Sequence, residues 1–214
     1  MRKMVVFGGS GGLGKQLIPL LKQKYDVISL SSKDVDITNF NKIKDFFNVT
    51  DVDIVLNMSG KIYDVYLSKI SEYDCIYIEN MINVNIIGNI NILSTCLPKM
   101  IDKKWGRVIS ISSILSDMNI PKASLYSASK AFINRLYSSA NKENIEYGIT
   151  CNTIQLGYWD GGMCDKLNSN FKKSIKNSIG LKRFGKIEEL YNTINYIIDN
   201  EYVCGTNLKI DGGL

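Results

Sequence analysis

The sequence predicts an α/β fold in which a doubly wound parallel sheet lies between two layers of helices, a three-layer αβα arrangement. Short apolar segments typical of strands alternate along the 214 residues with longer segments whose apolar residues recur every three to four positions. A hydrophobic fraction of 45% and a charged fraction of 22% are those of a globular protein with a core. Three prolines, with no repeat or low-complexity segment, leave no candidate linker, so residues 1–214 are expected to form a single domain.

Six segments read as strands because each is a short apolar run bounded by turn residues or charges. The predicted strands are Lys3–Phe7, Asp26–Leu30, Asp53–Leu56, Arg107–Ile111, Ile149–Ile154 and Asn207–Ile210. Five segments have the apolar period of helices that cover a sheet. The predicted helices are Leu13–Lys24, Phe40–Asn48, Met81–Ile101, Ser124–Glu143 and Ile187–Asp199.

The chain contains no histidine, which excludes imidazole metal ligands and histidine-dependent nucleophiles. Acid–base chemistry therefore has to use Tyr, Lys, Asp, Glu or Cys, and no metal site is expected. The five cysteines show no CxxC spacing, and their odd number favours reduced thiols in the cytoplasm. The apolar run Met4–Phe7 is short for a signal peptide, and no run approaches the ~18 residues of a membrane helix.

The positive charge is modest. The chain has 26 Lys and Arg against 21 Asp and Glu, a net charge of +5, and its basic clusters are short. Solvated surfaces explain these clusters better than a nucleic-acid interface does, and no nucleic-acid partner is expected.

A glycine-rich loop separates the first predicted strand from the first predicted helix. Its residues are Gly8, Gly9, Ser10, Gly11, Gly12, Leu13 and Gly14. Backbone N–H groups of such a loop and the positive end of the helix bind a pyrophosphate, as in a Rossmann fold. The spacing Gly8, Gly12, Gly14 is GxxxGxG and differs from GxGxxG. The alternative is a flexible turn without a ligand.

The second predicted strand lacks the acidic residue that selects NAD. It ends in Ser31, Ser32 and Lys33, whose hydroxyls and cation suit a 2′-phosphate, so NADP(H) is preferred over NAD(H). The alternative is that Lys33 points to solvent, and Asp34 follows it. Asp36 has two interpretations, a carboxylate near the adenine amino group or a cap for the helix at Phe40.

Tyr126 and Lys130 are spaced to lie on one face of a helix. A neighbouring ammonium lowers the pKa of a phenol, so this pair can exchange a proton with a carbonyl or hydroxyl. A lone YxxxK is more often a helix surface. Here Ser112 and Ser113 close a strand, with Ser113 13 positions before Tyr126, and strand carboxyl ends are where ligands bind in α/β sheets.

At this point the chain resembles the short-chain dehydrogenase/reductase (SDR) family over essentially its whole length. The matching motifs are Gly8-xxx-Gly12-x-Gly14, Asn57-Met58-Ser59-Gly60, Val84-Asn85-Ile86-Ile87-Gly88, Gly106–Ser113 and Tyr126-xxx-Lys130. Arg183-Phe184-Gly185 and Asp211-Gly212-Gly213 are similar to motifs of bacterial 3-oxoacyl-[acyl-carrier-protein] reductases.

The resemblance implies a role for each matching residue. Ser113 would bind the substrate oxygen, Tyr126 would transfer the proton, and Lys130 would lower the tyrosine pKa and hold the nicotinamide ribose. Asn85 would anchor a water that resupplies protons. Each has a structural alternative: Asn85 as a polar residue at a helix kink, Ser113 as a strand-end hydroxyl, and Lys130 as a surface cation. The further residues expected to contact the cofactor are Asn57, Ser59, Gly60 and Gly157.

Several positions depart from the family pattern. Phe7 replaces a Thr before the first glycine, Met58 and Ser59 replace Asn and Ala, and Leu156 replaces a Pro. Relatives often carry a Thr in the segment Gly157–Cys164 that contacts the carboxamide of the nicotinamide, and this chain has none there. The backbone or Asp160 would have to make that contact instead. Its glycines suggest a mobile lid with Tyr158 and Trp159 as substrate platforms, or else an ordinary surface loop.

The expected function is that of an NAD(P)-dependent oxidoreductase that reduces a ketone to a secondary alcohol, or the reverse. A 3-oxoacyl thioester on an acidic carrier suits a protein of charge +5, and a sugar or another small polar metabolite is the alternative. A hypothesis of another class is a non-catalytic dinucleotide-binding sensor or assembly subunit. The resemblance implies a homodimer or homotetramer, with contacts through the helices near Asn85 and Tyr126.

Overall fold

The computed structural model describes residues 1–62 and 69–214, and its centre is one six-stranded sheet. All neighbouring strands are parallel, in the order β2-β1-β3-β4-β5-β6. The strands are β1 Lys3–Phe7, β2 Asp26–Leu30, β3 Ile54–Asn57, β4 Gly106–Ser113, β5 Ile149–Leu156 and β6 Asn207–Ile210. All six predicted strands are confirmed, but β3 starts one residue later, β4 starts one residue earlier, and β3, β4 and β5 run past their predicted ends.

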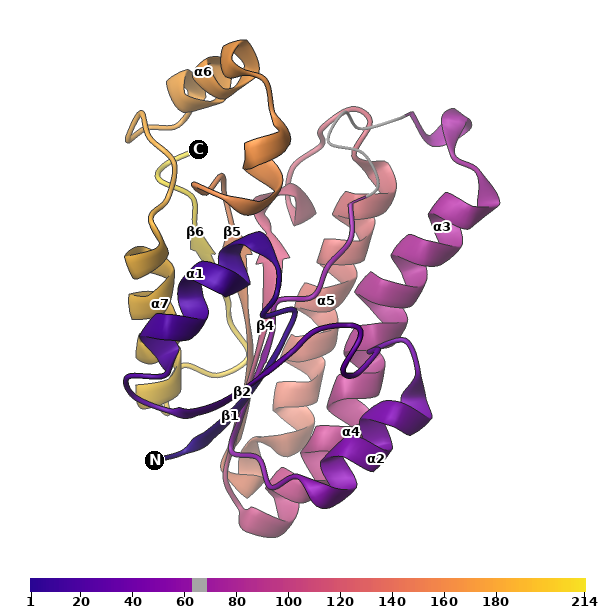
Figure 1. Cartoon of the computed structure of the whole chain (residues 1–214), viewed down its shortest axis with the longest axis vertical. Helices are drawn as coiled ribbons and strands as arrows, with labels where there is room; N and C mark the ends of the chain where they lie inside the picture. Colours follow the sequence, from indigo (N-terminus) through magenta and orange to yellow (C-terminus); the bar gives the residue numbers. More distant parts are fainter. Residues whose placement is uncertain (63–68) are drawn as a thin grey trace.

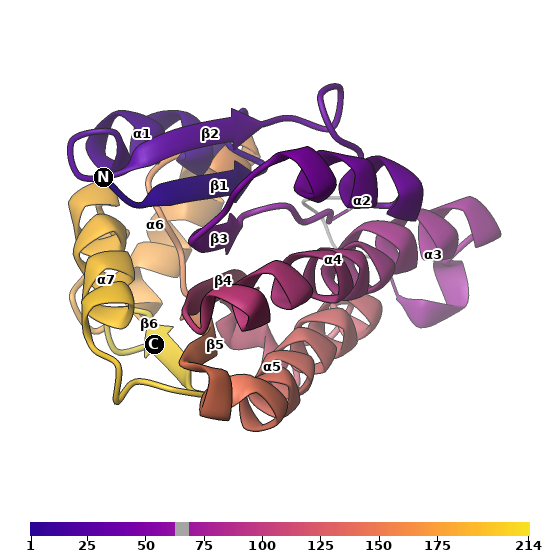
Figure 2. The same ribbon diagram turned by 90° about the horizontal axis from the view of Figure 1, so that it is seen from below.

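Helices cover both faces of this sheet, as Figures 1 and 2 show. The helices are α1 Gly12–Leu21, α2 Phe40–Val49, α3 Cys75–Ile82, α4 Gly88–Lys103, α5 Ser124–Asn144, α6 Ser169–Ser178 and α7 Ile187–Asp199. α1 and α7 lie on one face, and α2, α4 and α5 lie on the other. The predicted α/β fold with three layers is confirmed.

The side chains of β1 show why the fold has two cores. Val5 and Phe7 belong to the core under α2, α4 and α5, whereas Met4 and Val6 belong to the core under α1 and α7. Successive side chains of a strand point to opposite faces, so a continuous apolar run is the pattern of a strand buried on both sides.

α1 and α7 pack on each other although they come from opposite ends of the chain. Leu17 and Leu21 of α1 share a core with Leu190 and Ile194 of α7. Two polar contacts lie beside this packing: the Tyr25 hydroxyl donates to Asn195 at 2.6 Å, and Lys24 pairs with Asp199 at 2.6 Å.

Two helix predictions need correction, and one helix was missed. The single helix predicted over Met81–Ile101 is two helices, α3 and α4, joined by a π-helical segment at Asn83–Ile87. α1 ends at Leu21, three residues before the predicted end. α6 was not predicted, because Ser169–Ser178 has few apolar residues; its N-cap Asn168 accepts a hydrogen bond from the Phe171 N–H at 2.8 Å.

The strand order locates the ligand side of the sheet. β1 and β3 are neighbours, and the chain leaves β1 toward β2 on one side and β3 toward β4 on the other. In open α/β sheets ligands bind outside the carboxyl ends of the strands at such a switch point.

Within the described residues, no helix is long and apolar enough to cross a membrane, and no group of three His, Cys, Asp or Glu could hold a metal.

Candidate active site

The glycine loop is fixed against the end of β2. The N–H groups of Gly8 and Gly9 both donate to the Leu30 carbonyl, at 3.0 and 3.3 Å. Gly8 has φ +79°, and a Cβ there would lie 2.8 Å from the Ser59 nitrogen. A Cβ on Gly14 would lie 2.7 Å from the Gly8 carbonyl oxygen. Glycine is therefore required at both ends of the loop.

The start of α1 presents free backbone donors. Its N-cap is Gly11, and no side chain caps the first turn. Ser10 and Gly11 thus lie between β1 and the helix, and Gly12 and Leu13 are the first two residues of α1. The Gly11 N–H donates to the Gly8 carbonyl at 3.0 Å. The N–H groups of the first helical turn and the positive helix end are the elements that stabilise a pyrophosphate.

The turn after β3 is held by a buried polar network that the sequence did not reveal. Asn57 donates from Nδ2 to Asn89 Oδ1 at 2.9 Å and accepts from the Ser59 N–H at 2.9 Å. Asn89 Oδ1 also accepts from Ser110 and Tyr137, at 3.0 and 3.1 Å. Asn57 is fully buried, so its side chain shapes the turn that carries Ser59 and Gly60. The only sequence feature that pointed to Asn89 was its position four residues after Asn85, which places the two on the same face of a helix.

Asn85 ties the π-helical segment to its neighbours. Its Oδ1 accepts from the Lys61 N–H at 2.8 Å, and its Nδ2 donates to the Lys61 carbonyl and to Ser129 Oγ, both at 3.0 Å. Asn85 is thus the polar residue at an irregular helix turn, as one interpretation held, and it lies beside the residue that precedes Lys130. The water-anchoring role stays a prediction.

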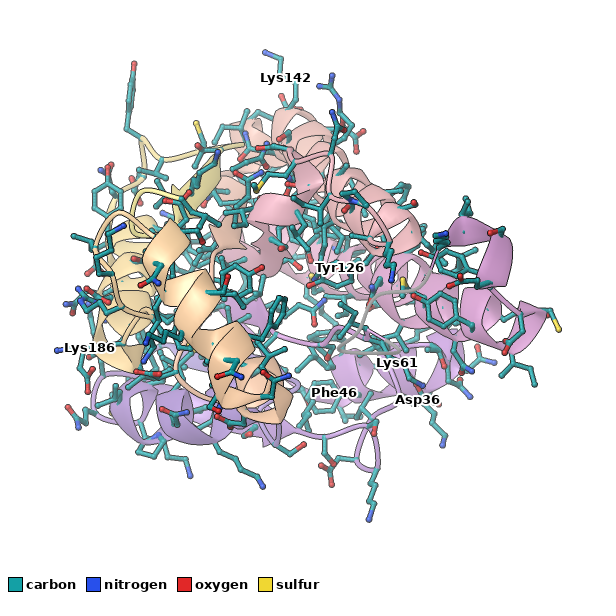
Figure 3. The ribbon with its side chains drawn as sticks, turned by 90° about the horizontal axis from the view of Figure 1, so that it is seen from above. Asp36, Phe46, Lys61, Tyr126, Lys142 and Lys186 are labelled. Carbon is teal, nitrogen blue, oxygen red and sulfur yellow. The ribbon has the colours of Figure 1, made fainter. Side chains whose placement is uncertain are left out.

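Ser113, Tyr126 and Lys130 come together at the carboxyl end of β4. The Lys130 ammonium lies 5.7 Å from the centre of the Tyr126 ring and donates to the Ile111 carbonyl at 2.9 Å. All three side chains are at least nine-tenths buried, which excludes the alternative of a surface cation for Lys130. Figure 3 shows Tyr126 near the middle of this end of the molecule.

Burial controls the ionisation of this pair. It raises the pKa of Tyr126 to about 12, against a smaller lowering effect of a hydrogen bond with Ser113. Burial also lowers the pKa of Lys130 to about 8. The expectation that Lys130 lowers the tyrosine pKa is therefore wrong for the protein alone. At neutral pH the phenol keeps its proton.

The carboxylate of Asp34, which the sequence analysis noted after Lys33, bonds to the first residue of the turn after β2. Asp34 Oδ2 accepts from the Ser31 N–H at 2.8 Å and from the Ser31 hydroxyl at 2.6 Å. These hydrogen bonds lower the pKa of Asp34. Ser32 and Lys33 are exposed, and Lys33 forms no ion pair with the part of the chain that the structure describes.

Asp36 does not cap α2. Its Oδ1 accepts from the N–H and the hydroxyl of Thr38, at 3.0 and 2.9 Å. The cap is Asn39, which accepts from the Lys42 N–H at 3.1 Å. The capping interpretation of Asp36 is wrong, and the adenine interpretation stays a prediction.

The segment after β5 contacts the glycine loop. A Cβ on Gly12 would collide with the backbone of Gly162, and Gln16 donates to the Asp160 carbonyl at 3.3 Å. Gly157 donates to the Ile210 carbonyl at 3.1 Å. The prediction of Trp159 as a substrate platform is wrong, because this side chain is buried in the core under α1 and α7.

A pocket of about 420 Å³ opens beside Tyr126. Ser113 and Tyr126 supply its hydroxyl groups together with Tyr158, and Lys122 is the one charged residue among the described residues that line it. Most of its wall is apolar. The apolar lining residues are Ile62, Ile114, Leu115, Ile120, Pro121, Leu156, Leu167 and Phe171.

A family model described as "short chain dehydrogenase" matches residues 30–172, more than half of the chain. The chain belongs to the short-chain dehydrogenase family. It is an oxidoreductase that acts on carbonyl or alcohol groups, as the sequence resemblance implied.

Relatives in this family are similar over nearly the whole chain. Carbonyl reductase family member 4 of Xenopus tropicalis is 28% identical, over 98% of this chain and 96% of its own length. The 3-oxoacyl-[acyl-carrier-protein] reductase FabG of Rickettsia prowazekii is 27% identical, over 99% of this chain and 86% of its own length.

Solved structures share the fold over nearly the whole chain. ElxO with NADP bound superposes with a TM-score of 0.87 at 22% identity, covering 99% of this chain and 98% of that one. A gluconate 5-dehydrogenase of Burkholderia cenocepacia, in complex with NADP and tartrate, has a TM-score of 0.86 at 18% identity, covering 99% and 94%.

Proposed function

We propose that this short-chain dehydrogenase is an NADP(H)-dependent reductase of 3-oxoacyl thioesters. One observation carries the proposal: a protonated phenol, Tyr126, lies beside Ser113 at the wall of an apolar pocket. One domain carries both the glycine loop and this pocket.

The residues present fit a nicotinamide dinucleotide. Uncapped N–H groups of the first turn of α1 suit the pyrophosphate. Ser31, Ser32 and Lys33 offer hydroxyls and a cation to a 2′-phosphate. Lys130 would hold the nicotinamide ribose; its Nζ lies 3.3 Å from where a Cβ on Gly60 would be. When bound, the dinucleotide supplies or accepts the hydride.

Tyr126 supplies the proton. A phenol with a pKa of about 12 is protonated at neutral pH and so is set to donate to the oxygen of a ketone. Ser113 orients that oxygen by hydrogen bonding. The protonated form of Tyr126 is the form that reduction of a ketone requires.

The apolar wall of the pocket favours a 3-oxoacyl thioester over a sugar or another small polar metabolite. Apolar side chains from the turn after β4, from the segment before α5 and from α6 line the pocket, and their contact with an acyl chain would be favourable. A sugar would need hydrogen-bond partners for each hydroxyl, which such a wall does not offer.

The substrate assignment is tested by following NADPH absorbance with acetoacetyl and longer 3-oxoacyl thioesters, and with polar keto sugars. We expect turnover of the thioesters. Phe171→Ala should raise the KM of the longer thioester and leave that of the acetoacetyl one nearly unchanged, and Tyr196→Ala, exposed on α7, serves as the control. Tight NADPH binding without oxidation by any ketone would favour the sensor hypothesis.

We also propose a homodimer or homotetramer in the cytoplasm. Ile87 and Phe132, near Asn85 and Tyr126, are more than one-third exposed although apolar, which suits a contact between copies. Sedimentation equilibrium of the wild type and of Phe132→Asp tests this. A monomeric wild type would contradict it.

A further inference from the structure

The segment before α5 makes a tight turn with a lysine at a position that favours glycine. The Ala123 N–H donates to the Ile120 carbonyl at 3.2 Å, so Pro121 and Lys122 are the two central residues of the turn. Lys122 has φ +69°. A proline followed by a positive φ is the pattern of a type II turn, whose third position favours glycine. A side chain there strains the backbone, and such strain is found most often at functional sites.

The Lys122 side chain borders the pocket beside Tyr126. It is the one charged residue among the described residues that line this pocket of about 420 Å³, and the adjacent lining residues Ile120 and Pro121 are apolar. Lys122 is also exposed, so its side chain lies where the pocket meets solvent.

The Lys122 ammonium has no ionic partner within residues 1–62 and 69–214. The nearest acid along the chain, Asp117, accepts from Gln155 at 2.9 Å and from Ser116 at 3.1 Å. No Asp or Glu is among the described lining residues. The pocket wall therefore offers one unpaired cation and no carboxylate that would repel an anion, and a cation beside an apolar wall binds an anionic group strongly.

We propose that Lys122 is a specificity-determining residue that binds a carboxylate on the acyl group of the substrate. The inference rests on the proposed function and narrows its substrate to a 3-oxoacyl thioester of a dicarboxylic acid. Lys122 lies four positions before Tyr126, and both line one pocket. A carboxylate a few carbons from the ketone can therefore meet the ammonium while the ketone oxygen meets Tyr126. The phosphates of a coenzyme A arm lie a whole pantetheine chain away from the ketone and fit this spacing less well.

The test compares two thioesters of N-acetylcysteamine, the 3-oxoadipoyl thioester with its terminal carboxylate and the terminal methyl ester of the same compound. Lys122→Met removes the charge and keeps an unbranched side chain, Lys122→Arg restores the charge, and Lys122→Gly suits the turn. Lys142→Met is the control for net charge, because Lys142 is exposed on α5 and well separated from Tyr126 (Figure 3).

We expect the wild type to have a kcat/KM about tenfold higher for the carboxylate than for the methyl ester, the size of a charge-assisted hydrogen bond, and mainly through a lower KM. This preference should be lost in Lys122→Met and Lys122→Gly and kept in Lys122→Arg and the control. The kcat/KM for the methyl ester should stay within about twofold in every variant. Thermal unfolding confirms that each variant is folded.

A preference that is absent from the wild type, or that survives in both Lys122→Met and Lys122→Gly, would overturn the role of Lys122. Acetoacetyl coenzyme A and acetoacetyl-N-acetylcysteamine test the other source of negative charge. If Lys122→Met weakens only the coenzyme A thioester, the anion is a phosphate of the arm, and the carboxylate assignment is wrong. A wild type that reduces none of these thioesters contradicts the proposed function instead, and with it this proposal.

Discussion

The region around Tyr126 and the turn after β2 are built in opposite ways. Tyr126 and Lys130 are buried, and helix α5, strand β4 and the π-helical segment hold them together. The turn from Ser31 to Asp34 is largely exposed and is held by hydrogen bonds within itself. The residues proposed for the reaction are thus held by packing, whereas the residues proposed for cofactor selectivity lie in a short turn. A substitution in the first region should change rate or stability strongly, and one in the second should change selectivity modestly.

The largest effect should come from Tyr126→Phe, which removes the proposed proton donor and keeps the aromatic ring at the pocket wall. We expect kcat to fall by a factor of about 10²–10⁴, the usual contribution of a general acid, with little change in NADPH affinity. Steady-state kinetics and cofactor titration measure both. Tyr147→Phe, partly exposed before β5, is the control. A variant that keeps its activity within threefold would exclude Tyr126 as the donor.

Asn89→Ala should give the next largest effect, because three buried donors share its Oδ1. We expect the free energy of unfolding to fall by about 1–3 kcal/mol or more, the cost of leaving buried polar groups unpaired. Denaturant titration measures it. Asn80→Ala, whose side chain bonds to Ile76 in its own helix, should stay within about 0.5 kcal/mol. Equal losses in both variants would show that the network adds no stability.

The burial of Lys130 should be visible as a pH dependence. Its folded pKa of about 8 lies below the ordinary value of 10.5, so between those values the unfolded chain binds more protons. The contribution of Lys130 to the free energy of unfolding therefore increases as the pH rises from about 8 to 10, by at most about 1.4 kcal/mol per pH unit.

Lys130→Met should remove this gain. Denaturant titrations of wild type and variant at pH 8, 9 and 10 isolate it, because all other ionisable groups are common to both chains. Parallel pH dependences would mean that the ammonium is not buried in solution.

The smallest effect should come from Lys33→Ala in the exposed turn. We expect the dissociation constant of NADPH to rise by about two- to fivefold, the range of an exposed charge pair, and that of NADH to stay unchanged. Lys44→Ala, exposed on α2, controls for net charge. If NADH weakens equally, Lys33 acts on the whole nucleotide and not on its 2′-phosphate.

The same contrast separates what could be predicted from the sequence from what could not. Apolar periodicity located all six strands, and spacing alone put Tyr126 and Lys130 together, because both follow from repeating geometry. The hydrogen bonds between Asp34 and Ser31 depend on local turn geometry, and the network on Asn89 joins residues that are distant in sequence. The pKa of Tyr126 was misjudged because its burial could not be seen in the sequence.

The packing of α1 against α7 has a consequence for biosynthesis. Leu17 and Leu21 emerge from the ribosome long before the residues that cover them, Leu190 and Ile194, are made. The apolar face of α1 thus stays uncovered by its native partner while all the intervening elements are synthesised. A chain released before α7 would expose that face and be prone to aggregate.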